Sequence, residues 1–367
     1  MTDGLLRATP FHARVAEANR LNAWENRGGF TLASGDPSEA LAARFGAVLA
    51  DVSWHGRVAI SGKRAAEFVS RLMTRDASRL RPGEALKALW LNDAGGVRGS
   101  GTMARLGPQS FVLISVVEDL RWIADAAALY GVAVRDVTEE EGVLTLVGPA
   151  AGKVLAAAGL EADLGPLALR KFFWRGLDVT LSRLGGGTEL WCARDDALIV
   201  WDRIVKAGRA FALCPAGQRA LDIIDLESGI VQPGSDFAPA RDGFSPDPLP
   251  PSLGLDGLVD RDHVFNGRSG YLAAGPEKVL SGILFDSETP APRTILTRGG
   301  AAAGRTLGSL VSPALRRAVA LAVMDSDAAA PGTELTAGNL ACRTTPLPFL
   351  PTPAPLPPAT EAPPPGV

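Results

Sequence analysis

One stretch in the first third of the chain constrains the fold most, because its pattern changes from strand to helix to hairpins. RVAISG (57–62) alternates as a half-buried strand does, and AAEFVSRLM (65–73) then spaces its apolar residues as a helix does. The run 86–116 predicts three strands, with turns at 92–96 and 106–109 where Gly, Asn and Pro cluster. Because hairpins make neighbouring strands antiparallel, this stretch predicts a mixed α/β lobe with an antiparallel sheet.

A second unit of strands and helices follows. GVLTLVGPAAGKVLAAAG (142–159) predicts an apolar strand that turns at GPAA into an Ala-rich helix. TELWCA (188–193) predicts another strand, and 195–208 and 218–229 predict two amphipathic helices. Strands alternate with helices here, but the hairpins of the first stretch argue against a purely parallel sheet. The fold class is therefore α/β, of the α+β kind, with antiparallel sheets.

The pattern changes after a segment rich in Pro, Gly, Asp and Ser at 232–255, which suits an ordered loop between lobes. Beyond it, KVLSGILFD, ILTRGGAAAGRTLGSLVSP and RRAVALAVMD predict short strands separated by turns, which is typical of a small β-barrel. We predict two α/β lobes within residues 1–275, one of them at 51–140, and a C-terminal β-barrel domain at 276–352. The Pro-rich residues 353–367 predict a disordered tail.

Composition and charge exclude several classes of protein. The chain is 46% hydrophobic and 21% charged, which is typical of a globular protein and not of a disordered one. Its formal net charge of -3, with acids and bases interspersed, offers no basic surface for nucleic acid. Its first residues lack the apolar core of a signal peptide, and no apolar run reaches the roughly 20 residues of a membrane span. We expect a cytoplasmic protein that binds neither nucleic acid nor membrane.

Cysteines and histidines are too few and too scattered to predict a metal site. Cys192, Cys214 and Cys342 are odd in number and form no CxxC motif, so neither a disulfide framework nor a zinc site is indicated. The three histidines also lie far apart in the sequence. We expect reduced thiols and no metal cofactor.

Short strings in a fixed order along the chain resemble the motifs of one family. They are TPFH (9–12), LADVSWHGRVAISG (49–62), the Gly pair at 95–96, VGPAA (147–151), LESG (226–229), PLPPSL (248–253), FNGR (265–268) and PFLPT (348–352). In order and spacing they resemble the T-protein of the glycine cleavage system, the aminomethyltransferase superfamily, up to about residue 352. The resemblance implies three lobes around a central channel that holds tetrahydrofolate.

The resemblance also assigns two residues to this cofactor. Glu227, in LESG, corresponds to a carboxylate that faces the channel, and a carboxylate can accept paired N–H bonds from the aminopyrimidine edge of a pterin. Arg261 corresponds to an arginine that helps to hold the ligand, and a guanidinium suits the carboxylates of a folate glutamyl tail. The alternatives are a solvated helix-end Glu227 and a surface Arg261.

The chain departs from T-proteins where the reaction takes place. T-proteins carry two adjacent Asp residues after the Gly turn, whereas this chain has Gly99 and Ser100. A serine hydroxyl can exchange hydrogen bonds with a reacting group but cannot stabilise a developing cation as a carboxylate does. A Tyr-Thr-Gly-Glu segment of T-proteins is replaced by the glycines 185–187. Both changes resemble the tetrahydrofolate-dependent demethylases of the superfamily.

A third departure lies in DVSWHG (51–56), which places His55 at or next to a channel-facing methionine of T-proteins. Imidazole, with an ordinary pKa near 6.5, can donate or relay a proton to a leaving group at neutral pH. Trp54 is a candidate ring for stacking on the ligand, with core packing as its alternative. The catalytic candidates are therefore His55 and Ser100, and the cofactor-binding candidates are Glu227, Arg261 and Trp54.

These features predict a tetrahydrofolate-dependent transferase that moves a methyl or aminomethyl-derived carbon from a small methylated donor to the cofactor. One alternative is an aminomethyltransferase of the glycine-cleavage type. Another is a folate-binding regulator or oxidase subunit without catalysis, which loss of the Asp pair favours. The expected partners are the small-molecule donor and a carrier protein or partner subunit.

Overall fold

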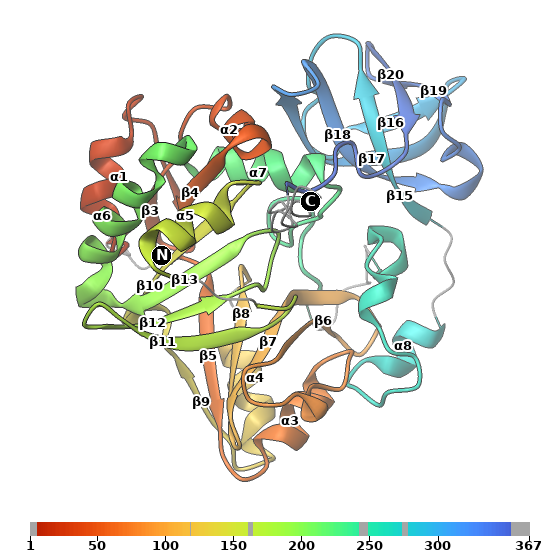
Figure 1. Cartoon of the computed structure of the whole chain (residues 1–367). Helices are drawn as coiled ribbons and strands as arrows, with labels where there is room; N and C mark the ends of the chain where they lie inside the picture. Colours follow the sequence, from red (N-terminus) through yellow and green to blue (C-terminus); the bar gives the residue numbers. More distant parts are fainter. Residues whose placement is uncertain (1–5, 118, 161–163, 242–248, 274–277, 354–367) are drawn as a thin grey trace, which may run out of the picture.

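The computed structural model describes residues 6–117, 119–160, 164–241, 249–273 and 278–353, which form three lobes (Figure 1). The segment 242–248 of the predicted inter-lobe loop and almost all of the predicted tail lie outside these described residues. The remainder of that loop is ordered and includes a short 3-10 helix at Pro251–Leu253.

The first lobe is built on a six-stranded sheet with the order β11-β12-β13-β10-β4-β14. Its strands are β4 (Ala47–Asp51), β10 (Glu141–Val147), β11 (Leu169–Trp174), β12 (Leu177–Ser182), β13 (Thr188–Ala193) and β14 (Leu213–Pro215). Its helices are α5 (Ala151–Ala158), α6 (Ala197–Gly208) and α7 (Gln218–Glu227). Its strands pair antiparallel except β14, which runs parallel to β4.

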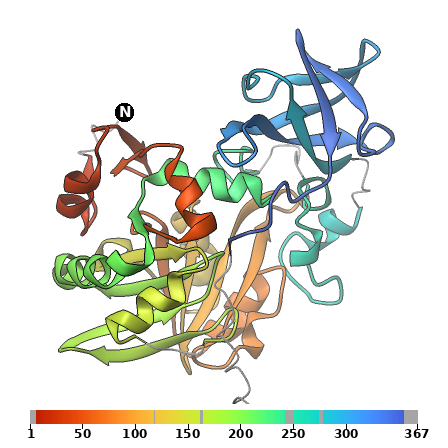
Figure 2. The same ribbon diagram turned by 45° about the horizontal axis from the view of Figure 1, so that its top comes forward.

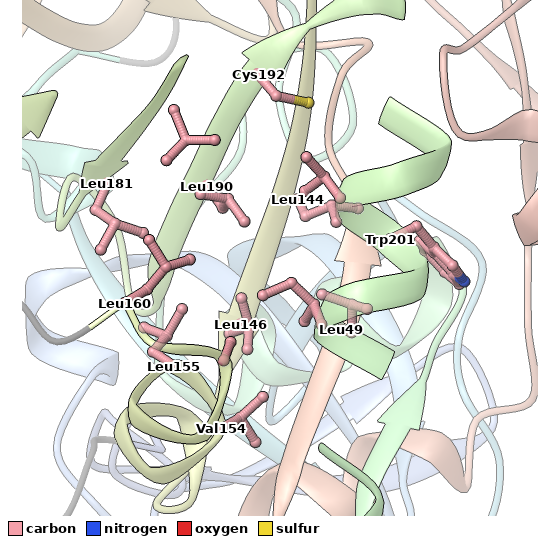
Figure 3. Close-up of a cluster of buried hydrophobic side chains, with 14 of the residues drawn as sticks. Leu49, Leu144, Leu146, Val154, Leu155, Leu160, Leu181, Leu190, Cys192 and Trp201 are labelled. Atoms are coloured by element: carbon pink, nitrogen blue, oxygen red, sulfur yellow. The ribbon is translucent and has the colours of Figure 1, made fainter. Parts of the chain in front are cut away.

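The core of this lobe lies between the sheet and helices α5 and α6 (Figure 3). Leu49, Leu144, Leu146 and Leu190 of the sheet face Val154 of α5 and Trp201 of α6 across it. Alternate residues of β4 and β10 reach this core because strand side chains point to opposite faces. The predicted strand at 142–147, the helix after it and the helix at 195–208 are confirmed.

A small N-terminal sheet, which the sequence pattern did not predict, adjoins this lobe. It has the order β1-β3-β2 and contains β1 (Arg7–Ala8), β2 (Trp24–Arg27) and β3 (Phe30–Ala33). Helices α1 (His12–Ala18) and α2 (Glu39–Phe45) flank it in sequence. These elements are too short to show a periodic pattern in the sequence.

The second lobe holds a five-stranded sheet with the order β6-β7-β8-β5-β9. Its strands are β5 (Gly56–Ser61), β6 (Ala85–Leu91), β7 (Val97–Gly107), β8 (Ser110–Ser115) and β9 (Ala133–Asp136). Helices α3 (Ala65–Leu72) and α4 (Leu120–Ala128) pack on it through Phe68 and Ile123. All strand pairings in this sheet are antiparallel, which confirms the predicted hairpins. The predicted strand at 57–62 and helix at 65–73 are confirmed as β5 and α3.

The third lobe is a closed barrel with the order β15-β18-β17-β16-β19-β20. Its strands are β15 (Lys278–Phe285), β16 (Ile295–Arg298), β17 (Ala301–Ser312), β18 (Arg317–Asp325), β19 (Glu334–Ala337) and β20 (Leu340–Thr345). The barrel confirms the predicted C-terminal fold. Helix α8 (Arg268–Ala273) precedes it in the chain.

Helix α7 joins the lobes, because it contacts α2 and β4 on one side and barrel strands β17 and β18 on the other (Figure 2). Its buried Ala220, Ile223 and Ile224 pack against Ala40 and Val48. Within the described residues, none of the helices combines the length and apolar character needed to cross a membrane.

Candidate functional site

A cavity with a volume of about 1170 Å³ lies where α7, the β2–β3 hairpin and barrel strand β17 meet. The residues that line it from α7 and the following loop include Gln218, Asp222, Asp225, Gln232 and Asp236. Other elements contribute residues such as Arg27, Trp54, His55, Val116 and Leu307. All three lobes therefore contribute to its wall. Small-molecule sites typically have volumes of about 300–1,000 Å³, so this cavity is large enough for a ligand of cofactor size.

Trp54 and His55 enter this cavity from the turn after β4. The Trp54 indole Nε1 donates a hydrogen bond of 3.0 Å to Gln218 Oε1, and Gln218 Nε2 donates one of 2.7 Å to the Asp51 carbonyl. The Trp54 and His55 rings meet edge to face, with centroids 4.6 Å apart. The two predicted pocket residues thus lie together with their rings held in place.

The environment of His55 restricts its chemistry. Burial, with the positive charges of Arg57 and Arg27 adding to it, lowers the pKa of the imidazole to about 3. Neither ring nitrogen has a hydrogen-bond partner among the described residues, although the ring lines the cavity. His55 is therefore a neutral hydrogen-bonding group at physiological pH, and an imidazolium acid is not available there.

Two carboxylates that the sequence analysis did not single out also line the cavity, Asp225 on α7 and Asp236 on the loop after it. Gln232 lies between them: its Nε2 donates to Asp225 Oδ2 at 2.9 Å and its backbone N–H to Asp236 Oδ2 at 2.7 Å. Burial raises the pKa of both carboxyl groups to about 6. For Asp225, the sequence offered one clue: Asp222 and Asp225 are spaced one helical turn apart in LDIID, so they lie on the same face of the helix.

Glu227, the predicted pterin ligand, is 1% exposed and is not among the residues that line this cavity. Arg44 Nη2 donates to its Oε2 and Ser312 Oγ donates to its Oε1, both at 2.5 Å. The Leu350 N–H donates to its carbonyl, and Arg44 also donates to the Pro351 carbonyl. Glu227 therefore ties α7 to α2, to β17 and to the PFLPT segment.

Ser100 lies in the middle of β7, opposite Leu89, and its carbonyl accepts a hydrogen bond of 3.0 Å from Ser115 Oγ. It is absent from the cavity wall described above. Gly99 pairs with Trp90, and a Cβ at Gly99 would lie 2.1 Å from the Trp90 ring. The indole of Trp90 thus occupies the space that a side chain at Gly99 would need.

Arg261 lies apart from the cavity, with its side chain 63% exposed. Its guanidinium is 3.4 Å from Asp256 and 5.5 Å from the centroid of the Tyr271 ring. Of the five predicted site residues, the structure brings only Trp54 and His55 to this cavity. The roles predicted for Ser100, Glu227 and Arg261 stay predictions.

Metal-binding groups do not cluster in the part of the chain that the structure describes, where no group of three or more His, Cys, Asp or Glu could hold an ion. The cysteines there are free thiols. Burial raises the pKa of Cys192 to about 12 and that of Cys342 to about 11, so both stay protonated at neutral pH.

Comparison with known proteins matches residues 10–246 to the family described as the GCVT N-terminal domain. An aminomethyltransferase of Frankia alni is 32% identical over 75% of this chain and 77% of its own length. One from Geobacillus thermodenitrificans is 29% identical over 89% of this chain and 91% of its own. The crystal structure of the glycine cleavage system aminomethyltransferase T from Bartonella henselae superposes with a TM-score of 0.82, at 23% identity, over 94% of this chain and 98% of that chain.

The contact between Gly99 and Trp90 predicts that an acidic residue cannot simply be restored. We expect Gly99→Asp to lower the free energy of unfolding by about 3 kcal/mol, because the new side chain overlaps a buried indole. Ser100→Asp, at a half-buried position, should cost clearly less. Urea denaturation of both variants measures this, and equal costs would contradict the steric account.

The pairing of Glu227 with Arg44 predicts a structural cost for its removal. We expect Glu227→Gln to lower the free energy of unfolding by roughly 3 kcal/mol, because it leaves the Arg44 guanidinium partly buried without its counter-charge. Glu67→Gln, at an exposed ion pair with Arg64, is the matched control and should cost much less, because solvent screens that pair. Similar urea midpoints for the two variants would refute the network.

The pKa of Asp225 predicts a pH dependence of stability. Folding raises this pKa from its ordinary value of 3.8 to about 6. The protonated carboxyl therefore stabilises the fold fully below about pH 3.8, and this contribution is lost as the pH rises through about 6. We expect Asp225→Asn to gain stability relative to the wild type between about pH 4 and pH 7. A constant difference in urea midpoints over that range would show that Asp225 is not desolvated.

Proposed function

The chain belongs to the aminomethyltransferase superfamily of the glycine cleavage T-protein, and from that premise we propose that it transfers a one-carbon group to tetrahydrofolate. The observation that carries the proposal is the cavity of about 1170 Å³ to which all three lobes contribute. The leading form of the reaction is demethylation of a small methylated donor. Aminomethyl transfer of the glycine-cleavage type is the second candidate, because the relatives are aminomethyltransferases.

The residues of the cavity fit a folate. Trp54 and Leu307 supply apolar surface for a flat ring, and Gln218 and Gln232 supply donors and acceptors for a polar edge. When bound, tetrahydrofolate supplies the nitrogen that accepts the carbon, so the protein contributes mainly orientation and exclusion of water.

His55 and Trp54 have distinct tasks in this proposal. The neutral His55 imidazole can accept or donate one hydrogen bond at the reacting end, and it stays neutral throughout the physiological range. Trp54 forms a fixed wall because its indole N–H is already bonded to Gln218. Ser100 does not line the cavity, and its role at the reacting end is proposed on the strength of the resemblance alone.

Glu227 and Arg261 are proposed as folate residues on the strength of the resemblance. A carboxylate offers about four acceptor positions, and Arg44 and Ser312 use one on each oxygen. The remaining acceptor positions are those that a pterin edge would use, although the Glu227 carboxylate is buried outside the cavity. Arg261 lies at the protein surface, so it could bind the folate only through a glutamyl tail that extends out of the cavity. In the aminomethyl alternative the donor arrives on a carrier protein, which would be the chain's macromolecular partner.

Titration with tetrahydrofolate tests the proposal. We expect binding to the wild type and at least a roughly tenfold weaker affinity in Trp54→Ala, because the variant loses a buried wall of the cavity. Phe173→Ala, which removes a ring that is 78% exposed, is the control and should bind as the wild type does. Absence of binding to the wild type would refute the proposal.

Product analysis then separates the candidate reactions. Methylated donors should yield 5-methyl-tetrahydrofolate, whereas an aminomethyl donor on its carrier should yield 5,10-methylene-tetrahydrofolate. Binding of tetrahydrofolate without product from either type of donor would contradict catalysis and indicate a folate-binding regulator or subunit.

A further inference from the structure

The charged residues of the cavity do not balance. Arg27 donates two hydrogen bonds to Asp222, at 2.7 and 2.5 Å, so these two charges neutralise each other. Arg219 and Asp36 contribute one charge of each sign at the cavity margin, where Arg219 is exposed and Asp36 accepts a hydrogen bond from the Ser38 N–H. The carboxylates of Asp225 and Asp236 remain.

Neither of these two carboxylates forms an ion pair with a described residue, although the charges of Lys87 and Arg27 are near enough to favour the ionised form of Asp225. Among the described residues, each carboxylate accepts a hydrogen bond from Gln232: its side-chain Nε2 donates to Asp225 Oδ2 and its backbone N–H donates to Asp236 Oδ2. Because a neutral amide cannot offset two negative charges, burial raises the pKa of both groups to about 6. Both are still mostly ionised at pH 7, so the cavity has an uncompensated negative charge there.

Asp236 has a local structural task, but Asp225 does not. The Asp236 carboxylate accepts a hydrogen bond from the Gln232 N–H within its own turn. Its Oδ1 also lies against Gly308, only 2.1 Å from where a Cβ at that position would be. The Asp225 carboxylate caps no turn and forms no ion pair within the described ranges, where its one hydrogen bond comes from the Gln232 side chain. A structural role therefore does not account for a buried carboxylate at position 225.

A second, independent feature points to a ligand in the same cavity. The His55 ring lines the cavity, yet its nitrogens form no hydrogen bond with any described residue. The indole of Trp54 lies against it, and aromatic rings attract methylated cations as well as flat rings. Acidic, aromatic and unpaired polar groups thus share one wall.

Resting on the proposed transferase function, we infer that Asp225, with Asp236, selects a donor that carries a positive charge, namely a methylated ammonium or sulfonium compound. Such a cation would neutralise the two carboxylates and place its methyl groups against apolar and aromatic surface. Neutral methyl ethers would leave the carboxylates unpaired and are disfavoured by the same argument.

Calorimetric titration of the full chain with choline, and with its neutral carbon isostere 3,3-dimethyl-1-butanol, tests this inference. We expect choline to bind at least about tenfold more tightly than the isostere, because only choline compensates the carboxylate charge. Trimethylsulfonium should behave like choline. Equal affinities for choline and the isostere would overturn the inference.

Variants assign the effect to the carboxylates. Asp225→Asn keeps the size of the side chain and should weaken choline binding about tenfold, while leaving the affinities for the isostere and for tetrahydrofolate unchanged. Asp236→Asn should also weaken choline binding, and it replaces Asp225→Asn as the test if that variant does not fold. Asp195→Asn, at an exposed position outside the cavity, is the matched control.

The folate titration keeps the two proposals distinguishable. Loss of tetrahydrofolate affinity in Asp225→Asn, with choline binding intact, would overturn the inference and assign Asp225 to the cofactor. Choline binding that depends on Asp225 in a wild type that does not bind tetrahydrofolate would support the cation site and refute the proposed transferase.

Discussion

The buried ion pair between Arg44 and Glu227 is the interaction on which the arrangement of the lobes depends. It joins α2 to α7, and through Ser312 it extends to the barrel. The backbone of Glu227 and the side chain of Arg44 also bind the C-terminal segment at Leu350 and Pro351. Since a buried charge needs a partner of opposite charge, these segments can only be buried together.

This anchoring explains how one helix can both join lobes and line a site. The apolar side of α7 packs on the first lobe, and its end is held to the barrel by Glu227. The side that remains presents Gln218, Asp222 and Asp225 to the cavity. The cavity is thus a consequence of three lobes meeting at a single amphipathic helix.

The packing of Trp90 explains why Gly99 carries no acidic side chain. The Trp90 indole fills the space beside Gly99, and its N–H donates to Asp119, which also pairs with Arg98. A carboxylate has no room at Gly99 while that ring is there. The acidic groups of this cavity lie on α7 and on the loop after it, where burial raises the pKa of Asp225 and Asp236 to about 6.

The sequence by itself determined the elements with a clear period, such as the strand and helix at 57–73 and the C-terminal barrel, because side-chain alternation is a local property. Motif order determined the superfamily. The short N-terminal sheet and the acidic pair of Asp225 and Asp236 were not predicted from the sequence. Only the tertiary structure decided which groups meet: whether Glu227 is paired, whether His55 is neutral and which carboxylates share a cavity all depend on residues distant in the chain.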